Sequence, residues 1–316
     1  MIRMLVGVLV AISLVGVRAA QEQQQPVFRG GSEAVPVFVT VTDGSGRLVT
    51  TLNQDAFEVR DEGKPQPITL FDNSPRAIRL IVMLDVSGSM VGNLPLLRAG
   101  TVQLVKYLRA DDSARIGTFG NEIVISPTFT RSANELLATL PSEINPSAPT
   151  PLWRAMDQAM AAFAGHTDDA RHVVVVLSDG QDSGLINFRD KFITQADIGT
   201  RARREDVMIY GIGMRSTNSR PVGLGPGGLQ AALTAGQPDP GLARVAEESG
   251  GGYLEVRFGD DLGQAFAQVA EELHSQYLLG FDPPKRDGKT HDVEVKVKER
   301  GLKVRARKSY VAPKEG

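Results

Sequence analysis

Hydrophobic residues follow three different spacings along the chain. Residues 35–77 alternate apolar and polar positions in short runs, as at Val37, Val39 and Val41, and turn signals at residues 43–46 and 61–65 separate the runs. This alternation predicts short antiparallel strands with one buried face. Residues 276–316 have the same spacing and predict about three more strands.

The middle of the chain, residues 78–275, has a different pattern. Continuous apolar runs such as residues 79–84 (RLIVML) and 172–177 (HVVVVL) alternate with segments of helical periodicity such as residues 94–108. Strands that are apolar throughout are typical of a parallel sheet covered on both faces. We therefore predict an α/β fold with a Rossmann-like, doubly wound, mostly parallel sheet. Residues 216–240 are rich in Gly, Pro and Asn and are interpreted as a flexible insertion.

Each flank is close to the length of about 40 residues below which a folded unit usually needs a staple, so we expect neither to bury a core alone. The chain has no cysteine to supply one. We therefore expect residues 35–77 and 276–316 to pack together as one small β-sandwich-like unit beside the α/β domain.

The N-terminus has the pattern of an export signal. Arg3 is followed by an apolar run from Met4 to Val17 and by Val17-Arg18-Ala19, a small-x-small pattern before a cleavage site. We interpret residues 1–20 as a signal peptide and residues 21–34 as a linker, with an uncleaved anchor as the alternative. The expected location is the periplasm, the cell surface or the medium of a bacterium, with no stable membrane span after cleavage.

Composition excludes several classes of function. The chain has 35 basic and 37 acidic residues and a formal net charge of -2, which gives no general affinity for nucleic acid. The absence of cysteine excludes disulfides, thiol nucleophiles and thiolate metal sites.

Oxygen donors gather where predicted elements begin and end. Asp85 and Asp179 follow two apolar strands, Ser87 and Ser89 lie just after Asp85, and Thr150 directly precedes a helix. Because ligands of open α/β sheets bind at the carboxyl ends of the strands, we expect these five side chains to converge. Two carboxylates and three hydroxyls suit Mg²⁺, Mn²⁺ or Ca²⁺ and argue against zinc or copper. The alternative is that the aspartates only cap turns.

Three motifs in order, DVSGSM, the Thr of SAPTPLW and LSDGQDS, resemble the metal-ion-dependent adhesion site of von Willebrand factor type A domains. The resemblance covers residues 78–275. The flanks also resemble those of an exported, acidobacterial-type group of bacterial proteins related to these domains.

The resemblance implies a role for each residue. Ser87 and Ser89 would bind the ion directly, Asp85 directly or through water, and Asp179 through water. Thr150 would bind directly in one state and through water in another, and the flanking Pro149 and Pro151 stiffen its loop. A carboxylate from a partner protein would fill the remaining position, which implies metal-dependent protein–protein interaction or adhesion.

Two other functions stay open from the sequence. One is an envelope scaffold or assembly factor whose metal is purely structural, and the weaker one is a metal-assisted hydrolase. The sequence has no G-x-S-x-G nucleophile motif, and His166, His172, His274 and His291 form no zinc-binding pair. The loops at residues 87–93, 147–150 and 180–190 carry no cluster of Lys or Arg to hold a phosphate. We therefore predict that the protein is not an enzyme.

Overall fold

The computed structural model describes residues 34–166, 169–179, 181–183, 192–214, 238–256 and 262–314. The predicted signal peptide, residues 21–33 of the predicted linker and residues 216–237 of the Gly- and Pro-rich stretch lie outside these ranges. Within them, no helix combines the length and the hydropathy that a membrane crossing requires.

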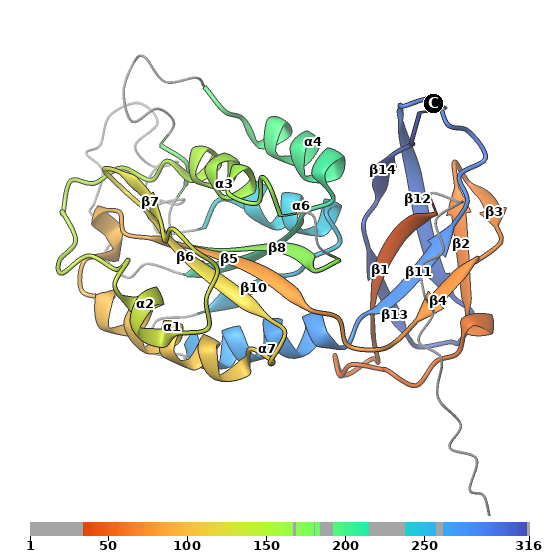
Figure 1. Cartoon of the computed structure of the whole chain (residues 1–316), viewed down its shortest axis with the longest axis horizontal. Coiled ribbons are helices and arrows are strands. Elements are labelled where there is room, and N and C mark those ends of the chain that lie inside the picture. The colour runs from red at the N-terminus through yellow and green to blue at the C-terminus, as the bar shows by residue number, and fades with distance from the viewer. Residues whose placement is uncertain are drawn as a thin grey trace, which may run out of the picture. The chain divides into compact units, whose positions relative to one another are not determined.

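The middle of the chain forms a six-stranded sheet in the order β10-β9-β8-β5-β6-β7 (Figure 1). Its strands are β5 (Ile78–Asp85), β6 (Ser113–Phe119), β7 (Ile123–Ile125), β8 (Arg171–Ser178), β9 (Met208–Met214) and β10 (Tyr253–Val256). All neighbouring strands are parallel except β6 and β7. The central strands β5 and β8 are adjacent, so their carboxyl ends bring together the residues that follow them.

Helices cover both faces of this sheet (Figure 1). On one face, α1 (Leu94–Tyr107), α2 (Ala133–Leu137) and α7 (Leu262–His274) share a core with Leu80, Val82 and Leu84. On the other, α3 (Leu152–Ala161), α4 (Gln195–Glu205) and α6 (Pro240–Glu248) share a core with Ile81 and Met83. Alternate residues of β5 thus enter opposite cores, which explains its continuous apolar sequence. The predicted Rossmann-like α/β fold is confirmed.

The two flanks form two four-stranded sheets, in the orders β13-β1-β11-β4 and β14-β12-β2-β3. The strands are β1 (Val35–Thr42), β2 (Phe57–Asp61), β3 (Lys64–Gln66), β4 (Leu70–Asp72), β11 (Tyr277–Phe281), β12 (Thr290–Val297), β13 (Lys303–Ala306) and β14 (Ser309–Val311). Each sheet contains strands from both flanks, and one core joins the sheets. The sequence predicted about three strands after residue 276, and the structure adds the short β14, which pairs with β12.

Short 3-10 turns lie at Gln54–Ala56 and Gly88–Met90. A two-residue turn joins β2 to β3, with positive φ at both Glu62 (48°) and Gly63 (75°). This geometry matches the right-handed twist of the flanking strands.

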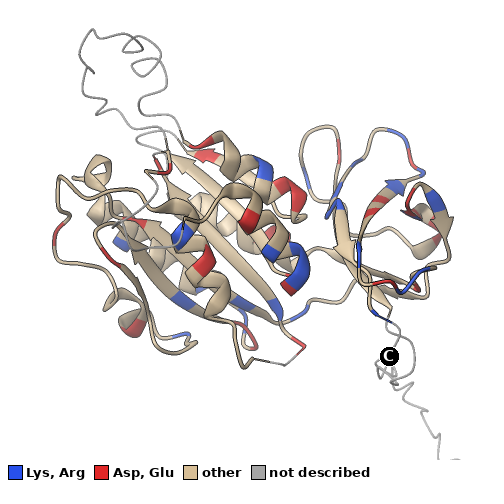
Figure 2. Ribbon diagram, turned by 90° about the horizontal axis from the view of Figure 1, so that it is seen from above, with Lys and Arg blue, Asp and Glu red and all other residues tan. Residues whose placement is uncertain are grey.

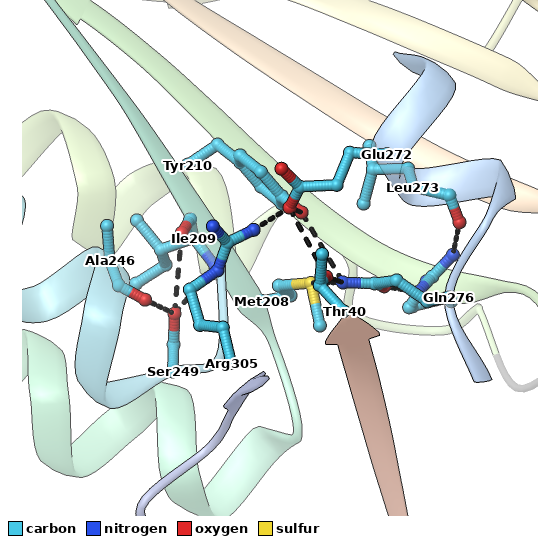
Figure 3. A network of polar contacts seen from close by, with 11 residues as sticks. Thr40, Met208, Ile209, Tyr210, Ala246, Ser249, Glu272, Leu273, Gln276 and Arg305 are labelled. Atoms are coloured by element: carbon cyan, nitrogen blue, oxygen red, sulfur yellow. Dashed lines mark hydrogen bonds and ion pairs between the residues drawn. The ribbon is translucent and has the colours of Figure 1, made fainter. Parts of the chain in front are cut away.

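Polar side chains link the flank sheets to the α/β part (Figure 3). Glu272 of α7 accepts a hydrogen bond from the Tyr210 hydroxyl of β9 (2.5 Å) and forms an ion pair with Arg305 of β13. Just after α7, Gln276 donates from Nε2 to Thr40 Oγ1 of β1 (2.8 Å). Because Glu272 is 9% exposed, its charge depends on these partners.

Basic and acidic residues are interspersed over the described helices and strands (Figure 2). Neither sign is confined to one part of the ribbon, in line with a formal net charge of -2.

Candidate metal centre

Asp85 ends β5 and is completely buried. Its Oδ1 accepts a hydrogen bond from the backbone N–H of Ser87 (2.8 Å), and its Oδ2 accepts one from the hydroxyl of Ser178 (2.6 Å). Ser178 ends β8, the neighbouring parallel strand. The register of the two strands therefore places Ser178 at one oxygen of this carboxylate, and the loop after β5 holds the other.

The first loop of the site, residues 87–93, connects to the second carboxylate through two hydroxyls in series. The 3-10 turn at Gly88–Met90 places Ser87 Oγ and Ser89 Oγ 3.1 Å apart. Ser89 Oγ then donates to Asp179 Oδ1 at 2.6 Å, across a sequence separation of 90 residues. Four of the five predicted residues thus form one hydrogen-bonded chain: Asp85, Ser87, Ser89 and Asp179.

Thr150 joins this group through the main chain. Gly88 N donates to Ala148 O (3.0 Å), which attaches the Thr150 loop to the first loop. On its other side, Thr150 N donates to the side-chain hydroxyl of Ser183, and Ser183 N donates to Thr150 O; Ser183 lies four positions after Asp179. Thr150 is 8% exposed and directly precedes Pro151, the N-cap of α3.

Burial, and then the nearby Asp179 carboxylate, raise the pKa of Asp85 to about 7, against the lowering effect of its hydrogen bonds to Ser178 and Ser87. Two carboxylates in such a position repel each other, and a divalent cation between them would remove the repulsion.

The donor set consists of two carboxylates and three hydroxyls, which are hard oxygen ligands of the kind that Mg²⁺, Mn²⁺ and Ca²⁺ bind. Within the described ranges, no three His, Cys, Asp or Glu side chains cluster so as to hold a metal ion. The fit therefore depends on the hydroxyls of Ser87, Ser89 and Thr150. When bound, a cation would supply a positive charge able to attract an anionic group.

Residues 80–181 match the family model of the von Willebrand factor type A domain. This part of the chain is a von Willebrand factor type A domain. The likeness of the flanks to exported acidobacterial-type proteins stays a prediction.

Solved structures with a similar chain trace have low sequence identity. BatB from Bacteroides thetaiotaomicron is 16% identical, with 62% of this chain and 98% of that chain covered and a TM-score of 0.46. The vWF domain of the type V pili tip protein Mfa5 from Porphyromonas gingivalis is 12% identical, with 62% and 95% covered and a TM-score of 0.43. A von Willebrand factor type A protein from Catenulispora acidiphila is 12% identical, with 91% and 76% covered and a TM-score of 0.46. No curated protein sequence matches the chain significantly.

Three residues that hold the candidate site of the type A domain in place were not identified from the sequence. Ser178 holds Asp85, and Ser183 holds Thr150, as described above. At Gly88, a Cβ would lie 2.1 Å from Pro146 O, so only glycine allows the first two loops to approach so closely. Ser178 could have been found from its place at a strand end beside Asp179, whereas the contact of Gly88 depends on the packed loops.

The four histidines are placed away from this chemistry. His274 bonds to Asp112 (2.8 Å) and His291 to Asp61 (3.2 Å). His172 stacks on Phe163 and His166 meets the edge of Phe129. Two of the histidines are therefore hydrogen-bonded to aspartates, and two pack on aromatic rings.

Proposed function

We propose that the protein is a cation-dependent protein-interaction module that acts outside the cytoplasm. In this proposal Asp85, Ser87, Ser89, Thr150 and Asp179 hold a divalent cation, Mg²⁺ before Mn²⁺ or Ca²⁺. A partner protein then donates an Asp or Glu carboxylate to the ion. The predicted signal peptide supports a periplasmic, cell-surface or secreted location.

The observation that carries the proposal is the 2.6 Å hydrogen bond from Ser89 Oγ to Asp179 Oδ1. It joins the first and third motifs, which lie in different loops, and Ser87 Oγ lies 3.1 Å from Ser89 Oγ. A turn-capping role for each aspartate separately gives no reason for the hydroxyls and carboxylates to meet at one point.

The net charge of the five candidate ligands favours a carboxylate from a partner protein as the remaining ligand. Two carboxylates at most neutralise a divalent ion, and both oxygens of Asp85 are already hydrogen-bonded. A ligand set that does not exceed the charge of the ion leaves it attractive to a further anion. Protonation or amidation of the partner's carboxylate would remove that attraction.

The cation is tested first. Mg²⁺ or Mn²⁺ should raise the melting temperature of the purified protein, because a ligand that binds only the folded state stabilises it by about 2.7 kcal/mol at 100 times the dissociation constant. Asp85→Ala should abolish this response. The exposed Asp111→Ala is the matched control and should keep it. An Asp85→Ala variant that still responds fully would place the ion elsewhere.

The partner is tested by capture from envelope fractions with Mg²⁺ and with EDTA. Proteins retained by the wild type in Mg²⁺ should be released by EDTA and should not be retained by Asp179→Ala. If the cation raises the melting temperature but no protein is captured in a metal-dependent way, the metal is structural and the protein is a scaffold.

A further inference from the structure

The Thr150 loop is held by a segment outside the five candidate ligands. Thr150 N donates to Ser183 Oγ at 2.8 Å, and Ser183 N donates to Thr150 O at 2.9 Å. Both main-chain groups of Thr150 therefore bond to Ser183, and Thr150 O also accepts from Leu152 N (2.9 Å). Because Ser183 lies four positions after Asp179, these two hydrogen bonds hold the Thr150 loop against the loop that follows Asp179.

Asp182 strengthens the same connection. Its Oδ1 accepts from the backbone N–H of Trp153 in the first turn of α3 (3.3 Å), and its own N–H donates to Asp239 Oδ2 (3.2 Å). Asp239 is the N-cap of α6, where its Oδ1 accepts from Gly241 N (2.8 Å). Asp182 thus attaches the start of α3 to the start of α6.

The first loop holds the Thr150 loop from the other side. Gly88 N donates to Ala148 O at 3.0 Å, and Pro149 and Pro151 restrict the backbone on either side of Thr150. The Thr150 backbone consequently lies between two loops that each carry candidate ligands.

We propose that Ser183 and Asp182 are positioning residues, which hold the Thr150 hydroxyl at the cation site in the orientation needed for binding. The inference rests on the proposed function, because a positioning role requires a cation. A neutral hydroxyl is a weak ligand and contributes most when its loop is ordered before the ion arrives. Outer residues that orient metal ligands typically change metal affinity 10- to 100-fold when they are removed.

The test is a calorimetric titration of the full chain with Mn²⁺ alone. Ser183→Ala removes the acceptor for Thr150 N and should weaken Mn²⁺ binding by roughly 10- to 100-fold. Ser183→Thr retains a hydroxyl and should restore the affinity. Ser147→Ala deletes an exposed hydroxyl of the same loop and should stay within about twofold of the wild type, as surface substitutions usually do.

A second pair of variants covers the case in which Ser183→Ala folds poorly. Asp182→Ala removes the acceptor for Trp153 N and should weaken Mn²⁺ binding, whereas Asp182→Asn keeps an oxygen there and should not. Melting temperatures without metal are measured alongside, because a merely structural role would lower them without changing the Mn²⁺ affinity.

The outcomes separate this inference from the proposed function. If Asp85→Ala abolishes binding while Ser183→Ala and Asp182→Ala bind Mn²⁺ as the wild type does, the positioning role is overturned and the cation site remains. If the wild type binds no Mn²⁺, the proposed function is overturned and the positioning role with it.

Discussion

Asp85 combines complete burial with a second carboxylate nearby, that of Asp179. It lies fully buried at the end of a central strand, and its pKa of about 7 is above the ordinary value of an aspartate because burial and Asp179 both disfavour the carboxylate. In the metal-free protein the folded state therefore holds a proton at pH values where the unfolded chain has lost it. Through Asp85, the free energy of unfolding should therefore decrease as the pH rises from about 4 to 7. Above pH 7 it should decrease no further from this cause.

Comparison with Asp85→Asn isolates this effect. Between pH 5 and pH 8, metal-free wild type should lose about 2.7 kcal/mol of unfolding free energy relative to the variant, because about two pKa units fall in this window at 1.36 kcal/mol each. Urea unfolding in EDTA at several pH values measures it. Parallel pH profiles for the two proteins would contradict the prediction.

The same residue makes cation binding depend on pH. Because a proton on Asp85 competes with the cation, Mg²⁺ should raise the melting temperature more at pH 8 than at pH 5. Thermal unfolding with and without Mg²⁺ at the two pH values measures this difference. An equal Mg²⁺ effect at both would mean that Asp85 does not carry the competing proton.

Glycine is required at position 88 because the packed loops leave no room there for a side chain. A methyl group there would overlap Pro146 O, a main-chain atom that cannot move without the loop. Gly88→Ala should therefore separate the first two loops and weaken both folding and cation binding, with a loss of about 1–3 kcal/mol in stability, as overpacking typically costs. Gly44→Ala is the control, because a Cβ there meets nothing within 4 Å. Chemical denaturation of both variants decides, and equal stabilities would show that the loops accommodate the methyl group.

At the scale of elements, β11 is an inner strand of one flank sheet, where it lies between β1 and β4. Its Tyr277 hydroxyl accepts from Leu52 N and donates to Val49 O, both at 2.9 Å, so it fixes the segment that leads from β1 to β2. The ring also packs on Phe57, with centroids 4.9 Å apart.

Tyr277→Phe keeps the ring and leaves the buried N–H of Leu52 without its acceptor. The expected loss is about 1–3 kcal/mol, the cost of an unsatisfied buried polar group. Tyr107→Phe removes the hydroxyl of an exposed tyrosine and should change little. Denaturant midpoints of the two variants give the measurement, and similar midpoints would mean that water replaces the lost acceptor.

At the scale of the whole molecule, the flanks depend on each other. β1 pairs with β11 and β13, and β2 pairs with β12, so the N-terminal strands have C-terminal partners. Deletion of residues 280–316 removes β12, β13 and β14 and the end of β11. Residues 35–77 should then become sensitive to protease, while residues 78–275 resist.

Limited proteolysis followed by mass spectrometry measures this outcome, with the full chain as the control. Protection of the N-terminal strands after the deletion would show that they hold their structure without the C-terminal flank.

Much of this organisation is encoded locally. Continuous apolar runs indicated β5 and β8 because both faces of these strands are buried, and the helical spacing of residues 94–108 indicated α1. The five candidate site residues could be named because strand ends and helix starts are local features, and parallel strands bring their carboxyl ends to one edge. Their role as cation ligands remains a prediction.

Only the tertiary structure decided which distant groups meet. Three features have no local sequence signal: the order of strands in the flank sheets, the space at Gly88 and the hydrogen bonds between Ser183 and Thr150. Each depends on the packed distance between loops or strands that are far apart in the chain. A periodic pattern reports which face of an element is buried, but the partner on that face is set by how all the elements fill the core together.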